Sequence, residues 1–420
     1  MRKYDVVVCG GGLTGVAAAV QAKRSGAGSV LLIERYGFLG GLATNGLINP
    51  FMPYWKQGVP PEEGGQLVFG IFEEILHELE KMGGLAENRC NFDAECMKIV
   101  LQRMCLKAGV ELLLHTVIEQ VHVKGDRMVA VRVANKSGIE FMAADSFIDC
   151  TGDADVAHLC GCPWKKGRDE DGQCQPMTLC FRIGNVDLKK YYENRQMMQE
   201  LYKKFQAEGK ITNPRENVLV FNTLVDGMLH FNTTRVIKHN PTDPLDVTHA
   251  EMIAREQMLE MYNFLHDNIP GFEHSQLLYS AGEIGARESR MIIGEYVLNE
   301  MDLKDCTKFE DGIAAGNYDI DIHSPDGSGT SHYYFPEGTW YTIPYRCLQP
   351  KNASNLLVAG RCISTTHEAQ ASVRIMPIVT TLGEAAGVAA ALASKAGVDV
   401  KHVDVKALRE QLTREGAFVG

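Results

Sequence analysis

A glycine-rich turn near the amino terminus constrains the fold more than any other feature of this 420-residue chain. The pattern G-x-G-x-x-G starts at Gly10, directly after the apolar run 5–9. The alanine-rich segment 14–25 follows it, and a second apolar run occupies residues 30–33. This order predicts a strand, a tight turn, a helix and a second parallel strand, which together make the βαβ unit of an α/β protein.

The spacing of the glycines also predicts a dinucleotide site. In such a turn Gly10 permits the tight bend, Gly12 lets the backbone approach a pyrophosphate, and Gly15 allows the helix to pack closely on the strand. The free N–H groups at the start of the helix would face the phosphates. Glu34 ends the second strand nineteen positions after Gly15, where an acidic side chain can hold ribose hydroxyls.

The residues that follow distinguish between dinucleotides. Glu34-Arg35 leads to Gly40-Gly41, and an acidic residue followed six positions later by a Gly-Gly turn resembles FAD-binding domains of the glutathione-reductase type. Near the carboxyl end, the run 355–361 resembles the late strand of these flavoproteins. Its glycine, Gly360, would approach the ribityl and phosphate region, and Arg361 stands where many relatives carry Asp.

Five further motifs make the chain similar to a family of FAD-dependent oxidoreductases known as FAD_oxidored. They are Gly40–Thr44, Asp149–Asp155, the G-x-R-E-x-R run that starts at Gly285, Ile343–Arg346 and Arg374–Pro377. The resemblance implies an FAD-dependent oxidoreductase with FAD as its cofactor. Pattern and resemblance together predict a cofactor site made of Gly10, Gly12, Leu13, Thr14, Gly15, Glu34, Arg35, Gly41, Ala43, Ile118, Thr151, Gly152, Gly360, Arg361, Met376 and Gly383.

The predicted fold is α/β, with a Rossmann-like three-layer FAD-binding domain and an inserted α+β substrate domain. Residues 1–160 and 340–420 would form the FAD-binding domain, because a buried strand and an alanine-rich helix return after Leu356. Residues 161–339 would form the substrate or cap domain. The alanine-rich helix around 381–391 would direct its positive amino-terminal end toward the flavin.

Within the predicted substrate domain the sequence indicates helices and a hairpin. Residues 188–207 are amphipathic and predict a helix. A second helix is expected to start at the capping box Thr248-x-x-Glu251 and to end near Asn268, before Pro270-Gly271. Two strand-like runs flank Asp226-Gly227 and predict a hairpin with a short turn.

Few catalytic side chains are needed, because flavin itself carries the hydride chemistry. His367 follows the Gly360-Arg361 turn and is the first candidate for an acid or base; the alternative is a buried, hydrogen-bonded histidine. Arg287 and Arg374 are candidates to clamp a substrate carboxylate or to stabilise negative charge on the flavin, with interdomain salt bridges as the alternative. Arg290 follows Arg287 by three residues on a predicted helix, so both would reach one face.

Composition excludes several classes of partner. Lys+Arg 42 against Asp+Glu 53 gives a net charge of -11, which argues against nucleic acid and anionic lipid. No apolar run of about 18 uncharged residues is present, so no membrane span is expected. Without a recognisable secretion signal, the twelve cysteines predict reduced thiols in the cytoplasm. Cys160 and Cys162 lack further cysteines at ligand spacing, so no metal is expected.

The expected reaction is hydride transfer between a small organic substrate and flavin N5, either oxidising an alcohol or amine or reducing an activated double bond. The expected partner is that small molecule, and the sequence also allows a homo-oligomer. Two other functions fit the glycine motifs. One is a flavin-binding electron-transfer or redox-sensing subunit, and the other is a thiazole-synthase-like biosynthetic protein in which the bound dinucleotide is substrate.

Overall fold

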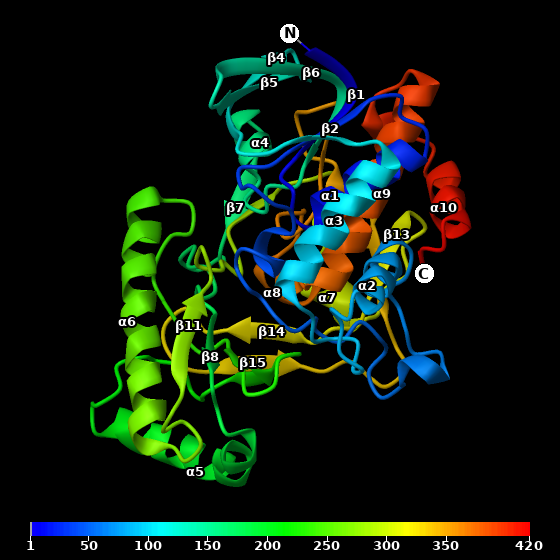
Figure 1. The fold of residues 1–420 in the computed structure, drawn as a ribbon. Helices are drawn as coiled ribbons and strands as arrows, with labels where there is room; N and C mark the ends of the chain where they lie inside the picture. Colours follow the sequence, from blue (N-terminus) through cyan, green and yellow to red (C-terminus); the bar gives the residue numbers. More distant parts are fainter. Residues whose placement is uncertain (1) are drawn as a thin grey trace.

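A largely parallel sheet lies at the centre of the larger part of the molecule (Figure 1). The computed structural model describes residues 2–420. The strands of this sheet are β1 (Arg2–Cys9), β2 (Val30–Ile33), β3 (Glu111–Leu113), β4 (Val117–Lys124), β5 (Arg127–Asn135), β6 (Gly138–Asp149) and β17 (Leu356–Val358). Their order is β3-β2-β1-β6-β5-β4, with β17 also paired to β6.

The pairing within this sheet brings the two ends of the chain together. Strands β3, β2, β1, β6 and β17 are parallel, whereas β5 and β4 add an antiparallel extension. On the edge of β6 opposite β1, β5 pairs with the first half and β17 with the last three residues. The fold is therefore α/β with a parallel sheet, as the sequence predicts, and the carboxyl-terminal segment completes it.

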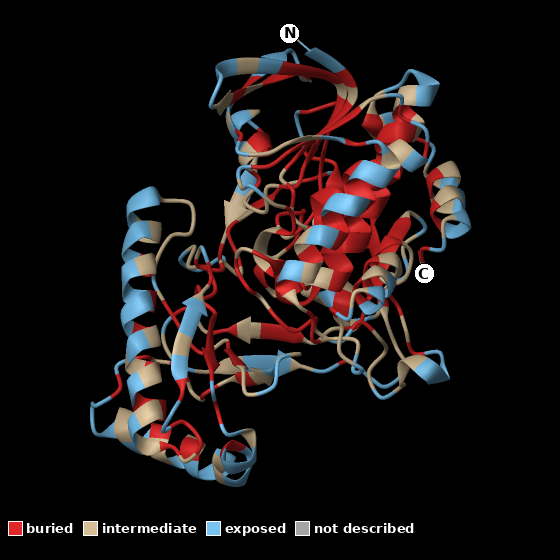
Figure 2. Cartoon of the chain, viewed as in Figure 1, coloured by how far each residue is buried: buried red, intermediate tan, exposed pale blue. Residues whose placement is uncertain are grey.

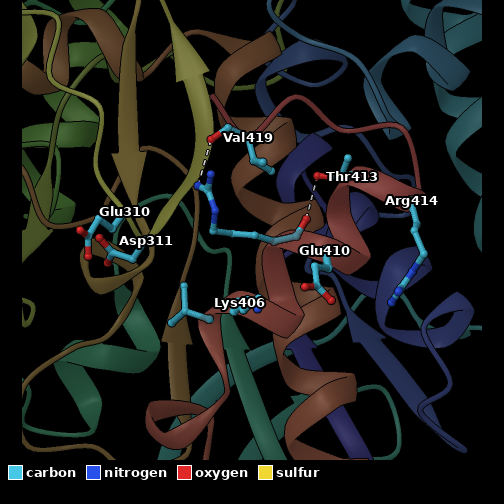
Figure 3. A pocket seen from close by; sticks show the side chains of 9 residues that line it. Glu310, Asp311, Lys406, Glu410, Thr413, Arg414 and Val419 are labelled. Carbon is cyan, nitrogen blue, oxygen red and sulfur yellow. Dashed lines mark hydrogen bonds between the residues drawn. The ribbon is translucent and has the colours of Figure 1, made fainter.

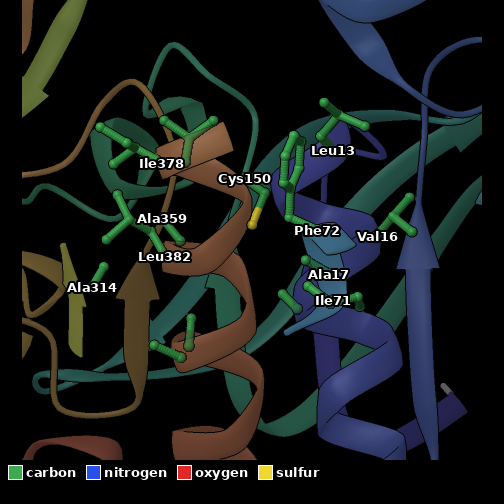
Figure 4. Close-up of a cluster of buried hydrophobic side chains, with 14 of the residues drawn as sticks. Leu13, Val16, Ala17, Ile71, Phe72, Cys150, Ala314, Ala359, Ile378 and Leu382 are labelled. Atoms are coloured by element: carbon green, nitrogen blue, oxygen red, sulfur yellow. The ribbon is translucent and has the colours of Figure 1, made fainter. Parts of the chain in front are cut away.

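Four helices cover one face of this sheet. They are α1 (Leu13–Arg24), α2 (Ile71–Lys81), α3 (Ala94–Ala108) and α9 (Met376–Ala396). Helix α1 runs between α3 and α9, and Figure 4 shows Ala17 of α1 and Leu382 of α9 in one cluster of buried side chains. Glycines allow this closeness, because a Cβ at Gly387 would lie 2.2 Å from the carbonyl oxygen of Ala18.

Helix α9 is long and apolar enough to cross a membrane by length and composition, but 89% of its most apolar window is buried inside the protein (Figure 2). Glu384 interrupts the run, so the sequence has no uncharged apolar stretch of about 18 residues, yet the helix passes a test that tolerates two charges. Its burial identifies α9 as a core helix here.

The second part of the molecule is built on a four-stranded antiparallel sheet in the order β11-β8-β10-β9. The strands are β8 (Phe181–Gly184), β9 (Val220–Asn222), β10 (Leu229–Phe231) and β11 (Gln276–Ser280). Helices α5 (Leu188–Ala207) and α6 (Pro244–Asn268) flank it, and each keeps one exposed face (Figure 2). Phe181, Ile183 and Phe231 form its core with side chains from both helices.

Smaller elements complete the molecule. They are α4 (Asp155–Leu159), β7 (Trp164–Lys166), β12 (Arg290–Ile292), α7 (Glu300–Lys304), β13 (Gly312–Gly316), β14 (Ile320–His323), β15 (Thr330–Tyr333), β16 (Tyr341–Pro344), α8 (His367–Val373) and α10 (Val405–Arg414). Leu298, Leu303 and Ile313 pack into the core of α1 and α9. These three residues lie within 161–339, the range that the sequence assigns to the substrate part, although they pack against the other part.

Local predictions in the second part succeeded to different degrees. Helix α5 has the predicted bounds. Helix α6 starts four residues before Thr248, because Asp243 caps it and Pro244 occupies its first position, so the predicted start was wrong. The β9–β10 hairpin forms, but Asn222 pairs with Leu229, so its connection is longer than the predicted short turn.

Candidate cofactor and substrate site

A cavity of about 580 Å³ opens where β1, β2 and β6 end and α1 begins. Strands β1 and β6 lead into Gly10 and Thr151, and β17 leads into Gly360. Most predicted cofactor residues line it: Gly10, Gly12, Leu13, Thr14, Glu34, Arg35, Gly41, Ala43, Ile118, Thr151, Gly152, Gly360, Arg361 and Met376. The residues come from five separate stretches of the chain, which the parallel sheet brings to one edge.

The glycine turn has the geometry of a phosphate cradle. Gly10 has a φ of +99°, and a Cβ there would lie 2.5 Å from the carbonyl oxygen of Cys150. A Cβ at Gly12 would meet no protein atom within 4 Å, so its Cα faces open space beside the start of α1. No side chain caps this helix, which leaves its first N–H groups available to an anion. The turn therefore fits the pyrophosphate of a dinucleotide.

Two predicted cofactor residues are absent from the cavity wall. A Cβ at Gly15 would lie 1.8 Å from the carbonyl oxygen of Gly10, so Gly15 allows the helix to approach the strand, as its spacing predicts. A Cβ at Gly383 would lie 2.1 Å from the carbonyl oxygen of Thr14. The structure thus places Gly383 at the α1–α9 contact, where it brings α9 close to the cradle without lining the cavity.

Glu34 is held rigidly at the cavity wall. It is only 6% exposed, and its carboxylate accepts hydrogen bonds from the backbone N–H of Gly11 at 2.6 Å and of Tyr36 at 2.8 Å. Burial raises the pKa of Glu34, although these hydrogen bonds act in the opposite direction. Each oxygen keeps a lone pair free, so the carboxylate can also accept from ribose hydroxyls.

Glu283 also lines the cavity, and sequence reasoning missed it. Its Oε2 lies 2.5 Å from Nη2 of Arg35, and it accepts a short hydrogen bond from the hydroxyl of Tyr36. Burial and Glu283 raise the pKa of Tyr36 well above its usual value. Because Glu283 follows β11 and Arg35 follows β2, only the tertiary structure brings them together.

Arg361 fixes the loop that follows β6. Its Nε donates to the carbonyl oxygen of Gly152 at 3.0 Å, and Nη2 pairs with Asp153 at 2.5 Å. Nη1 donates to the carbonyl oxygen of Ala286. The guanidinium therefore ties together three segments of the cavity wall.

The amino-terminal end of α9 faces the cavity through Met376 and Val379. No side chain caps this end, so its positive dipole is directed at the bound group. Arg374 lines the same region, with Nη2 at 3.7 Å from Oδ2 of Asp321 and with its Nε unbonded. Positive charge thus gathers where a flavin ring would extend from the cradle.

The structure places His367 outside the cavity wall. It starts α8, is 4% exposed, and its Nδ1 lies 2.8 Å from Oε1 of Glu288. Burial alone would lower the pKa of His367, but the hydrogen bond and charge of Glu288 outweigh it and raise that pKa. His367 therefore matches the alternative interpretation from the sequence, a buried and hydrogen-bonded histidine.

Arg287 also lies outside the wall, next to Ala286, which lines it. The predicted helix through Arg287 and Arg290 was wrong, because the chain is extended there: Gly285 bridges to Thr178, and Arg290 begins β12 and pairs with Asp155. Arg287 donates to Oγ1 of Thr178 at 2.5 Å. Burial, followed by nearby Arg215 and Arg374, lowers the pKa of Arg287 to about 9.

Other candidate sites carry no comparable features. A hollow of about 770 Å³ beside α10 is lined by side chains of both charges, including Glu310, Lys406 and Arg414 (Figure 3), and by none of the glycine motifs. Among residues 2–420, no group of three or more His, Cys, Asp or Glu side chains could hold a metal ion.

Comparison with known proteins agrees with this geometry. The model of the family described as FAD dependent oxidoreductase matches residues 5–412. The chain belongs to this family. FAD is its cofactor, and the protein is an FAD-dependent oxidoreductase. No curated protein matches the chain.

Solved structures are similar to the chain only at low identity and with TM-scores below 0.5. A geranylgeranyl bacteriochlorophyll reductase-like protein from Thermoplasma acidophilum has 14% identity and a TM-score of 0.48, covering 100% of this chain and 85% of that one. The p-nitrophenol 4-monooxygenase PnpA from Pseudomonas putida has 11% identity and a TM-score of 0.48, covering 100% and 87%. A triple mutant of the flavin-dependent brominase Bmp2 has 12% identity and a TM-score of 0.48, covering 97% and 84%.

Proposed function

We propose that this member of the family transfers a hydride between a small organic substrate and FAD. The observation that carries the proposal is the continuity of the site, because the phosphate cradle at Gly12 and the cationic region around Arg374 line one cavity. When bound, FAD supplies the centre that accepts or gives the hydride. The protein supplies binding, orientation and electrostatics.

The amino-terminal and carboxyl-terminal segments would hold the cofactor. Gly12 and the first N–H groups of α1 would bind the pyrophosphate, and Glu34 the adenosine ribose. The dipole of α9 and the charge of Arg374 would stabilise negative charge on the flavin ring. The second part, inserted between these segments, would cover the substrate.

Arg374 lines the cavity and would bind an acidic group next to the ring. Arg287 lies just outside the wall, where it would add positive charge, and Arg374 influences it electrostatically. His367 and Glu288 lie behind them, where Gln370 donates to the carbonyl oxygen of Arg287 at 2.9 Å. We propose that this pair positions Arg287 and does not exchange protons with the substrate directly.

The test is anaerobic reduction of the purified protein. We expect a yellow protein that releases FAD and not FMN, and whose absorbance near 450 nm bleaches with at least one alcohol, amine or reduced nicotinamide dinucleotide. A protein whose bound FAD is neither reduced by any of these donors nor, once reduced, reoxidised by activated double bonds would contradict hydride transfer.

A further inference from the structure

An arginine occupies the face of the second sheet opposite its apolar core. Arg182 lies in β8 between Phe181 and Ile183, both of which pack into that core. Because side chains alternate along a strand, Arg182 points away from the core. Its register partner in β10 is His230, so the two side chains lie next to each other on the same face.

This face holds polar groups that the protein leaves unsatisfied. Arg182 is 3% exposed, and its Nε lacks a hydrogen-bond partner within residues 2–420. His230 is 1% exposed, and its ring has no side-chain partner there, although the backbone of Asn49 lies close enough to raise its pKa. In the loop before β9, Arg215, at 5% exposed, also has an unbonded Nε, and its nearest carboxylate oxygen, on Glu216, is 3.8 Å away. Arg182 and Arg215 both act electrostatically on Cys180. Buried groups of this kind are costly unless a ligand binds them.

A chain of contacts connects Glu216, the sequence neighbour of Arg215, to the cavity. Arg374 lines the cavity and is 3.7 Å from Asp321, which is 3.4 Å from His323. His323 and Thr330 share a hydrogen bond of 3.0 Å, and Thr330 donates to the carboxylate of Glu216 next to Arg215. The hairpin of β14 and β15, which carries these links, contacts α8 (Figure 1).

The region carries an excess of positive charge. Its arginines are Arg182, Arg215, Arg235, Arg287 and Arg374, and its carboxylates are Glu216 and Asp321. The histidines add no charge, because burial and the neighbouring arginines lower the pKa of His230 and of His323 to about 3. The five arginines of this region therefore outnumber its two carboxylates, and among the described residues Arg182 and Arg287 have no carboxylate partner.

We propose that Arg182 and Arg215 bind carboxylates of the substrate, and that the substrate is a small organic acid with two or more negative charges. The proposal rests on the proposed function and adds the class of substrate. The planar guanidinium of each arginine matches a carboxylate in size and can form two parallel hydrogen bonds with it. Neutral His230 adds one further donor beside Arg182.

Equilibrium binding to the FAD-loaded protein tests this site. We would titrate acetate, succinate and citrate, with succinamide and inorganic phosphate as comparisons, and follow heat and the flavin absorption spectrum. Wild type should bind succinate or citrate more tightly than acetate, and should not bind succinamide. Arg182→Gln and Arg215→Gln should each weaken that binding at least ~10-fold.

Two further variants secure the interpretation. Arg195→Gln on the exposed face of α5 removes the same charge at a distance and should bind the acids as wild type does. Arg182→Lys keeps the charge, so it should retain part of the affinity if the glutamine variant folds poorly.

The possible results separate this proposal from the proposed function. Binding that is unchanged in Arg215→Gln and Arg182→Gln, or a preference for succinamide or phosphate over the carboxylic acids, would overturn it. The readout is binding and needs no turnover, so failure of flavin reduction would count against hydride transfer alone.

Discussion

Gly12 and Gly15 belong to one motif but meet different surroundings. A methyl group on Gly12 would project into the cavity, whereas one on Gly15 would collide with the carbonyl oxygen of Gly10. Gly12 thus leaves space for a ligand, and Gly15 leaves space for the backbone of Gly10. Cofactor binding and folding can therefore be separated by single substitutions within the same turn.

Gly12→Val should abolish FAD retention while leaving the apoprotein folded. The branched side chain would fill the space that the pyrophosphate needs but would touch no protein atom of the present structure. We expect almost no flavin per protein and an unfolding temperature of the apoprotein within ~2 °C of wild type.

Gly15→Ala is the matched control for this prediction. Its Cβ would lie 1.8 Å from a backbone atom, so it should lower the unfolding temperature of the apoprotein itself. Stoichiometric FAD in a folded Gly12→Val protein would show that the turn is only structural.

His367→Asn should affect stability more than chemistry. Glu288 raises the pKa of His367 in the folded protein, so the ion pair stabilises the fold fully below the unfolded pKa of about 6.5, and this contribution is lost as pH rises through the folded pKa. The wild type should therefore unfold at a higher temperature than the variant at pH 6, with a smaller difference at pH 9.

Flavin reduction decides between this role and direct acid or base catalysis. We expect the variant to keep FAD and to slow reduction less than ~10-fold. A slowing of ~10²–10⁴-fold at unchanged flavin content would instead make His367 the group that moves the substrate proton.

At the level of elements, the contact between α1 and α9 contains an unusual buried acid. Glu384 in α9 is fully buried and accepts a hydrogen bond of 2.8 Å from Nε2 of Gln21 in α1. Burial raises the pKa of Glu384 to about 8, although bonds from Ile71 and Gln21 oppose the shift. The carboxyl is therefore mostly neutral at pH 7, which is why an apolar helix can carry it.

Glu384→Gln should stabilise the protein at alkaline pH. A carboxyl whose folded pKa is raised destabilises the fold progressively as pH rises from about 4.5 to about 8, and glutamine removes this titration. The free energy of unfolding of the variant should exceed that of wild type by about 1–4 kcal/mol at pH 8.5 and by much less at pH 5. Denaturant unfolding at both pH values measures this, with the exposed Glu410→Gln as control. An equal effect at both pH values would contradict the assignment.

At the level of the whole molecule, the cofactor cavity joins residues from both ends of the chain, including Gly12, Ala43, Thr151 and Arg361. The second sheet, with α5 and α6, has a separate core. Binding of FAD should therefore stabilise the segments around the cavity together and leave the outer elements of the second part unaffected.

Hydrogen exchange with and without FAD checks this expectation. The segments 10–15, 34–43 and 360–379 should all gain protection on binding, because each contributes to one cavity. Residues 188–207 should serve as an internal reference without change. Protection confined to the amino-terminal segment would show that the carboxyl-terminal segment does not take part in the site.

How much could be predicted depended on the range of each interaction. The bounds of β2 and α5 and the Asp93 cap of α3 follow from local patterns of apolar and capping residues. The helix expected through Arg287 did not form. The backbone of Gly285, two residues earlier, pairs instead with Thr178, more than a hundred positions away. The glycine turn could be predicted because its motif spans only residues 10–15.

The unsatisfied arginines of the second sheet carry no such local signal. Arg182 alternates with apolar residues as in any strand with one polar face, and Arg215 lies far from it in sequence, in the loop before β9. Only the three-dimensional structure shows that Arg182 and Arg215 are buried. Glu283 was missed for the same reason, since its contact with Arg35 crosses both parts.

The close contact between α1 and α9 also governs the order of events during synthesis. A growing chain presents the glycine turn from its tenth residue onward, but the helix that covers α1 begins only at residue 376. Until then the small-residue face of α1 has no partner, and the edge of β6 that receives β17 is open. Chains fold from the amino terminus as the ribosome synthesises them, so the cofactor cavity of the nascent protein stays incomplete until the carboxyl-terminal segment has been made. Flavin loading therefore belongs to the last stage of translation or to the time after it.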